Sequence, residues 1–275
     1  MITAWLLYLG TGAFAGVLAG LLGIGGGLVI VPMLHFAFTL QGQPEAYIQH
    51  LALGTSLATI IFTSVSSLRA HHQRGAVVWA IVRAITPGIL IGTFLGSMLA
   101  AHLSTKFLSA FFVAFLYYVS AQMLLDIKPK PSRQAPGLLG MLGTGGVIGG
   151  VSSLVGIGGG TMSVPFMTWC NVPLHSCIGT SAAIGFPIAV AGAAGYMFNS
   201  PASGLPGLAE GYAGFIYLPA LLGVAAASIV TAPLGAKLAH SLPVRRLKKI
   251  FACLLLFMGT KMLWPLIKPW VLGLF

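Results

Sequence analysis

The sequence predicts an all-α polytopic membrane protein, and its composition carries this prediction. Hydrophobic residues make up 57% of the 275 residues and charged residues only 6%, whereas a soluble domain carries roughly 25% charged residues. From Gln134 to Ala209 the chain contains no Asp, Glu, Lys or Arg, a length sufficient for about three membrane spans. Long and uniformly apolar runs of this kind exclude a transmembrane β-barrel, whose strands are short and alternate in polarity.

Eight long apolar runs and two short ones follow one another along the chain. The long runs cover residues 3–22, 48–68, 76–101, 107–125, 137–155, 174–198, 213–240 and 247–264. We expect each to form a membrane-spanning helix, the first of them retained as a span rather than cleaved as a signal peptide. The short runs, 28–39 and 161–172, would cover only about 18 Å as helices, too little to cross a hydrocarbon core of about 30 Å.

A repeated glycine phrase predicts that the chain is a tandem duplication. The cluster Gly23–Gly27 is followed by Val31-Pro32, and the cluster Gly156–Gly160 is followed by Val164-Pro165 at the same spacing. A Gly-Thr-Ser triplet then follows each cluster in the same order. Because internal repetition indicates duplicated structural units, we predict an N-terminal transmembrane repeat at 1–132 and a C-terminal one at 133–275.

The basic loops predict how the two repeats are oriented. Lys and Arg collect in loops 69–74, 128–133 and 245–249. These loops share one side of the membrane only if each short segment helps return the chain across it, which gives five crossings per repeat. The positive-inside rule favours that arrangement, and an odd number of crossings makes the two repeats inverted. A short segment that folds back without crossing is the alternative.

The glycine clusters are the predicted substrate site. Consecutive glycines disfavour a helix by roughly 1 kcal/mol each, so the helix should break and restart at Leu28 or Thr161. The first N–H groups of the new helix, at the positive end of its dipole, bind anions without a basic side chain. Close helix packing through small residues is the alternative. The predicted residues are Gly25, Gly26, Gly27, Gly158, Gly159 and Gly160.

The Gly-Thr-Ser triplets and three ionisable residues complete the predicted site. Hydroxyl groups of the triplets either donate hydrogen bonds to an oxyanion or bond to carbonyl groups of their own helix. Two histidines stand shortly before the triplets, and one arginine lies within an apolar run, where an ionisable group suggests function. The triplets supply Gly54, Thr55, Ser56, Gly179, Thr180 and Ser181, and the accessory residues are His50, His175 and Arg83.

The charge balance excludes several partners and mechanisms. The formal net charge of +11 arises from 14 basic residues against Glu45, Asp126 and Glu210, and it reflects either the positive-inside rule or attraction of anions. No carboxylate lies in the middle of an apolar run, so proton or sodium coupling through a buried acid has no candidate. Basic residues flank spans rather than form a soluble face, which argues against nucleic acid as a partner. Three scattered cysteines predict no metal site, and we expect no cofactor.

The doubled glycine cluster with its Val-Pro, together with the doubled Gly-Thr-Ser, resembles the TauE/SafE family of sulfite exporters over essentially the whole chain. The resemblance implies an inner-membrane permease in which both repeats form one transport domain. The implied partners are the lipid bilayer and a small sulfur-containing anion such as sulfite, sulfoacetate or thiosulfate. The direction of transport and the oligomeric state, monomer or homodimer, stay open.

Three other functions compete with a transporter, and the duplicated glycine clusters argue against one of them, a purely structural subunit. An anion channel would use the same site without alternating access. An intramembrane hydrolase would use Ser163 or Ser181 with His175, but the sequence offers no residue to orient such a base. We therefore expect the chain not to be an enzyme.

Overall fold

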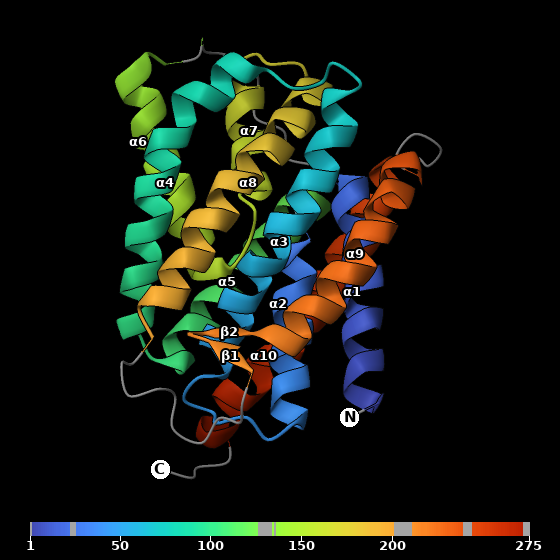
Figure 1. Cartoon of the computed structure of the whole chain (residues 1–275), viewed down its shortest axis with the longest axis vertical. Coiled ribbons are helices and arrows are strands. Elements are labelled where there is room, and N and C mark those ends of the chain that lie inside the picture. Colours follow the sequence, from blue (N-terminus) through green and yellow to red (C-terminus); the bar gives the residue numbers. More distant parts are fainter. Residues whose placement is uncertain are drawn as a thin grey trace.

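The computed structural model describes residues 2–22, 26–125, 134, 136–200, 211–238 and 244–271. This part of the chain is almost entirely helical, as the sequence predicts (Figure 1). The elements are α1 (Ile2–Leu22), α2 (Gly27–Leu40), α3 (Ile48–His72), α4 (Trp79–His102), α5 (Thr105–Leu124), α6 (Leu138–Val155), α7 (Gly160–Trp169), α8 (Leu174–Phe198), β1 (Tyr212–Ala213), β2 (Ile216–Tyr217), α9 (Leu218–Leu238) and α10 (Val244–Val271).

Seven of the described helices are long and apolar enough to cross a membrane, so the protein is a multi-pass membrane protein. They are α3, α4, α5, α6 and α8, with Leu218–Gly235 of α9 and Lys249–Lys268 of α10. Helix α1 contributes the shorter apolar stretch Ala4–Gly20. Helices α2 and α7 have 14 and 10 residues, which confirms that the segments after the glycine clusters are short.

One predicted run begins differently from the prediction. The run expected to be helical from residue 213 starts with a hairpin, in which Tyr212 pairs with Tyr217 and Ala213 with Ile216. Gly211 and Gly214 take φ values of 101° and 59°, a region that glycine enters without steric cost. These two glycines turn the chain before α9 begins.

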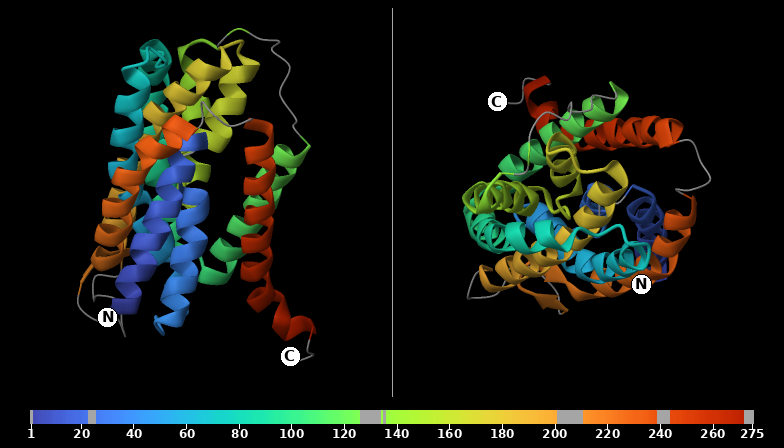
Figure 2. Two further views of the ribbon diagram at one scale, coloured as in Figure 1. Left: turned by 90° about the vertical axis from the view of Figure 1, so that its right-hand side faces the viewer. Right: turned by 90° about the horizontal axis from the view of Figure 1, so that it is seen from above.

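Each half of the chain starts with a helical hairpin that turns back inside the molecule. Helix α1 starts at the end that carries the N-terminus, and α2 returns toward that end (Figure 1). Helices α6 and α7 form a similar pair that starts from the opposite end, and their connection lies at mid-height in Figure 1. Both chain termini lie at the same end of the molecule (Figure 2).

Helices α3 and α8 form the centre of the bundle. The most apolar windows of these two helices are 67% and 72% buried, against 33–44% for the other candidate spans. The two helices pack along each other, and their outer neighbours are arranged in pairs: α1 packs along α9, α4 along α6, and α5 along α10. Residues on α3 and α8 are therefore best placed to surround a central site.

Glycines bring the outer pairs into close contact in both halves. A Cβ atom added to Gly12 of α1 would collide with the Val224 carbonyl group of α9. A Cβ atom added to Gly145 of α6 would collide with the Ile85 carbonyl group of α4. Small residues at such contacts let helix backbones approach within the membrane.

The two ends of the bundle differ in chemistry. At the end where α3 finishes and α4 begins, Arg69 and Arg74 lie on or beside the last turn of α3, and we call this the basic end. Helix α10 also begins toward this end (Figure 2), whereas loop 128–133 lies outside the described residues. The opposite end carries both termini and the β1–β2 hairpin, and we call it the hairpin end (Figure 1).

Candidate functional site

The two glycine clusters break the helices with the same backbone geometry. Gly26 and Gly159 are the N-cap residues of α2 and α7, with φ/ψ of 74°/−14° and 74°/−6°. Neither N-cap makes a side-chain cap hydrogen bond, so the first N–H groups of both helices lack the usual capping partner. The helices begin at Gly27 and Gly160, one residue earlier than predicted, because the αL glycine directly before each supplies the turn. Gly25 lies outside the described residues.

The two breaks meet inside the protein. A Cβ atom on Gly27 would lie 2.5 Å from the Gly156 carbonyl oxygen, so the start of α2 passes directly against the end of α6. The Ser56 hydroxyl of α3 donates a hydrogen bond of 2.8 Å to the same carbonyl oxygen. Ser56 therefore holds the second break in place from the central helix.

The first Gly-Thr pair of the predicted site contacts the hairpin. A Cβ atom on Gly54 would lie 2.5 Å from the Phe215 carbonyl oxygen, so only glycine allows the hairpin to approach α3 here. The Thr55 hydroxyl accepts a hydrogen bond of 3.0 Å from the backbone N–H of Tyr217. Because backbone N–H groups buried away from water need a partner, Thr55 anchors the start of α9.

The second Gly-Thr pair, Gly179 and Thr180, contacts the segment before α4 at the basic end in the same way. A Cβ atom on Gly179 would lie 2.5 Å from the Ala76 carbonyl oxygen. The Thr180 hydroxyl accepts a hydrogen bond of 2.9 Å from the backbone N–H of Val78, the N-cap residue of α4. We call each Gly-Thr pair a socket, since each receives the extended segment that leads into a helix of the bundle.

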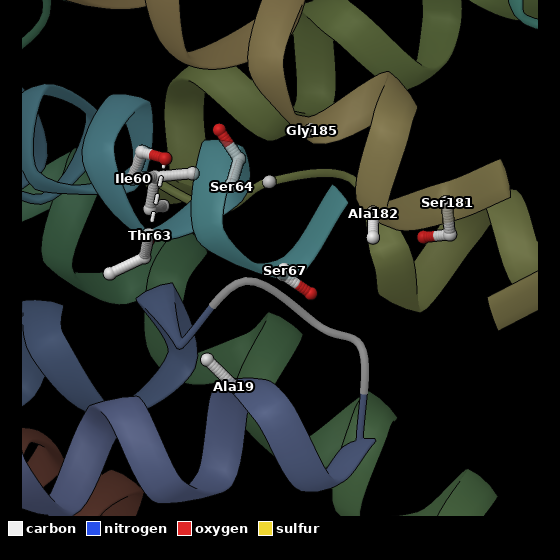
Figure 3. Close-up of a pocket in the computed structure, with 9 residues that line it drawn as sticks. Ala19, Ile60, Thr63, Ser64, Ser67, Ser181, Ala182 and Gly185 are labelled. Atoms are coloured by element: carbon white, nitrogen blue, oxygen red, sulfur yellow. Dashed lines mark hydrogen bonds between the residues drawn. The ribbon is translucent and has the colours of Figure 1, made fainter. Parts of the chain in front are cut away.

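The Ser181 hydroxyl faces a small pocket between α3 and α8. Ser163 of α7 donates a hydrogen bond of 3.0 Å to Ser181, and the pocket beside it has room for about one water molecule. Figure 3 shows hydroxyl groups of α3 across the pocket from Ser181. The lining residues are Ala19, Ile60, Thr63, Ser64, Ser67, Gly158, Ser181, Ala182 and Gly185. All of them are uncharged, so an anion here would be held by hydroxyl and backbone donors.

The predicted accessory residues do not gather at the breaks. His50 is buried, donates its Nε2–H to the carbonyl oxygens of Ala100 and Leu103 at 3.1 and 3.0 Å, and stacks on Phe215 at 5.0 Å. Its partners place it at the hairpin end. His175 is exposed in the first turn of α8, and Arg83 is exposed on α4.

Three hydroxyl-bearing pocket residues were missed from the sequence. Thr63, Ser64 and Ser67 lie on the pocket side of α3, about two to three turns after the Gly-Thr-Ser triplet. Their spacing of three and four residues is that of one helix face, and this was the signal available in the run 48–68. Among the described residues, no group of three or more His, Cys, Asp or Glu is placed to hold a metal ion.

Comparison with known proteins places the chain among membrane transporters. The family model described as sulfite exporter TauE/SafE matches residues 8–262. A probable membrane transporter protein of Haemophilus influenzae is 39% identical over 266 residues, covering 95% of this chain and 99% of the relative. A probable membrane transporter protein of Methanocaldococcus jannaschii is 26% identical over 92% of both chains.

A further relative and the search of solved structures complete the comparison. A probable membrane transporter protein of Bacillus subtilis is 26% identical over 72% of this chain and 80% of its own length. No solved structure matches the chain at a significant level. The family model and the Haemophilus influenzae relative both span nearly the whole sequence. The chain therefore belongs to the TauE/SafE family of membrane transporters.

Proposed function

We propose that this protein carries small sulfur-containing anions, such as sulfite, sulfoacetate or thiosulfate, across the cell's inner membrane and binds them at the paired helix breaks. The observation that carries the proposal is the pair of αL N-caps, Gly26 and Gly159, with nearly identical dihedral angles and no side-chain cap. Free N–H groups at a helix N-terminus form an anion site. Non-helical backbone at membrane depth persists only where protein or a wet cavity surrounds it.

The proposal includes two inverted repeats, residues 1–132 and 133–275, that rock against each other. Two kinds of contact recur in both halves and support it. The Gly12–Val224 contact corresponds to Gly145–Ile85, and the two sockets bind their segments through equivalent atoms. Inverted repeats place a substrate site at their interface near the bilayer midplane, where the two breaks meet.

The membrane potential supplies a driving force for export. The lining residues of the pocket are neutral, and no Asp or Glu lies in the middle of a predicted span, so no buried acid is available to carry a coupling proton. An interior negative by 100 mV favours the exit of one negative charge by about 2.3 kcal/mol. A uniporter that exports an anion needs no further coupling under these conditions.

Flux measurements in proteoliposomes test this function. Purified protein reconstituted into sealed vesicles should release preloaded radiolabelled sulfite or sulfoacetate faster than protein-free vesicles, with a rate that saturates as substrate rises. Saturation at modest turnover is expected because each cycle requires a conformational change. A rate that rises linearly with concentration and approaches diffusion would instead identify an anion channel, and no flux of any sulfur anion would refute the proposal.

A further inference from the structure

Two buried hydroxyl groups beside the second helix break have no hydrogen-bond partner. Ser152 of α6 is 0% exposed and Thr161 of α7 is 7% exposed. Neither Ser152 Oγ nor Thr161 Oγ1 is hydrogen-bonded within the described part of the chain. Most buried polar side-chain atoms in proteins are satisfied, so an exception calls for a specific explanation.

Ser152, near the end of α6, and Thr161, at the start of α7, flank the loop that forms the second break. The backbone carbonyl oxygen of Ser152 accepts the N–H groups of Gly156 and Ile157 at 2.8 and 3.1 Å, so this residue supports the loop that forms the break. Its Oγ atom lies 3.4 Å from the position of a Cβ atom on Gly159, the N-cap of α7. Thr161 stands in the first turn of α7. The N–H groups of Met162 and Ser163 donate to the Gly159 carbonyl oxygen, whereas those of Gly160 and Thr161 precede the first intrahelical hydrogen bonds.

Two hydrogen-bonded hydroxyl groups on α6 and α7 provide a comparison. Ser153 donates to the Gly150 carbonyl oxygen at 2.7 Å, and Thr168 donates to the Val164 carbonyl oxygen at 2.8 Å. This bonding to the preceding helix turn is the usual way that a serine or threonine in a helix satisfies its hydroxyl group. Ser152 does not use it, and Thr161, the second residue of α7, has no preceding turn of that helix to bond to.

The first break has no such groups. At the constant spacing that relates the two glycine clusters, Ala19 stands where Ser152 does and Leu28 where Thr161 does. Both are buried apolar residues, 3% and 1% exposed. The two breaks therefore share a backbone geometry, but at these two described positions the second break has hydroxyl groups and the first has apolar side chains.

We infer that the second break is the binding site for the oxyanion headgroup of the substrate, and we call this site the seat. Its hydrogen-bond donors are Ser152 Oγ, Thr161 Oγ1 and the first N–H groups of α7. This inference rests on the proposed function and assigns it to one of the two breaks. The ligand class is a small anion with several oxygen acceptors, because every donor is neutral and short. Helices α6 and α7 contain no charged residue, so the helix N-terminus provides the positive potential.

Binding measurements on matched variants test this seat. Ser152→Ala and Thr161→Val remove the unpartnered hydroxyls, while Ser153→Ala and Thr168→Val remove partnered hydroxyls from the same two helices. Each purified protein is titrated with sodium sulfite and with a small sulfonate, sodium chloride being used to hold the ionic strength constant. Removing one hydrogen bond to an anion should weaken binding roughly 10- to 100-fold, so Ser152→Ala and Thr161→Val should lose affinity while both controls keep it.

Thermal stability without ligand provides a second readout. Ser152→Ala should leave the melting temperature unchanged or raise it, because an unsatisfied polar group is removed. Ser153→Ala should lower it, because a satisfied bond is lost. If Ser152→Ala and Thr161→Val bind sulfite with wild-type affinity and sulfite flux is intact, the second break is not the binding site for the oxyanion. The proposed transport function would be unaffected by that result. Absence of binding and flux in the wild type would instead reject the proposed function itself.

Discussion

The two helix breaks have nearly the same backbone and different surroundings. Gly26 and Gly159 share a φ of 74°, which makes the chain turn and exposes the helix N-terminus at both places. Beside the second break stand Ser152, Thr161 and Ser163, whereas the corresponding residues of the first break are Ala19, Leu28 and Ile30, all buried. The two breaks thus share a backbone geometry, whereas their side chains give them different chemistry.

The two sockets also make similar backbone contacts with different side chains around them, one at each end of the bundle. The socket at the basic end holds a segment of small residues around Ala76 and Val78. The socket at the hairpin end holds Phe215 and Tyr217, which pack into an aromatic cluster with Tyr196, Tyr212 and their neighbours. Similar backbone contacts thus hold a segment of small side chains at one end and an aromatic cluster, which we call the aromatic seal, at the other.

The largest effect is expected from blocking the breaks. Gly26→Leu and Gly159→Leu should abolish anion flux, because a side chain is strained at positive φ and a Cβ atom on Gly159 would collide with the side chain of Ile188. Gly75→Leu is the matched control, since Gly75 also has positive φ, 66°, and nothing lies within 4 Å of its added Cβ atom. Flux is measured per molecule of protein recovered in the vesicles. Normal flux in both break variants would mean that the glycines serve packing alone.

The aromatic seal should be the most sensitive point for stability. Phe215 is 2% exposed and its ring lies 5.0 Å from His50 and 6.3 Å from Tyr196. Phe215→Ala should lower the free energy of unfolding by about 3 kcal/mol, as expected for a large buried ring. Phe107→Ala, at a position 51% exposed, should change it little. Denaturation in detergent measures both, and equal stability of the two variants would contradict a packed seal.

A smaller and equal effect is expected from the two sockets. Thr55→Val and Thr180→Val each remove the acceptor of a backbone N–H, which should cost about 1–3 kcal/mol of stability. Thr55→Ser and Thr180→Ser keep the hydroxyl and should retain most of it. The affinity for sulfite should remain close to that of the wild type in all four proteins, as measured by titration. A large loss of affinity without loss of stability would assign these hydroxyls to the substrate instead.

Much of the fold could be predicted because membrane helices are encoded by long apolar runs. The run 174–198 became α8, Leu174–Phe198, and the segments after the glycine clusters became the short helices α2 and α7. The hairpin at 212–217 was missed, because its residues are apolar and join the following helix without a break in hydropathy. The positive φ of Gly211 and Gly214 and the strand pairing of Tyr212 with Tyr217 separate it from α9. Glycine occurs 37 times in this chain, so these two glycines did not stand out as turn residues.

The candidate site could be predicted in part. The doubled glycine cluster marked both breaks, since three consecutive glycines have few other uses in an apolar run. The hydrogen bond from Ser56 to the Gly156 carbonyl oxygen joins residues 100 positions apart. It could not be predicted, because it depends on how α3 packs against the end of α6. The same reason explains why Ser152 and Thr161 were not singled out: a hydroxyl becomes notable only when the structure gives it no partner.

Locating a bound anion is the most direct test of the central claim, that the breaks hold the substrate. Selenite resembles sulfite in shape and charge, and its selenium atom can be located by anomalous diffraction from crystals of the protein. The peak should lie beside Gly159 at the N-terminus of α7, with Ser152 and Thr161 as its side-chain neighbours, and it should disappear in Gly159→Leu. A peak at the surface near Arg69 and Arg74, and none at either break, would contradict the account.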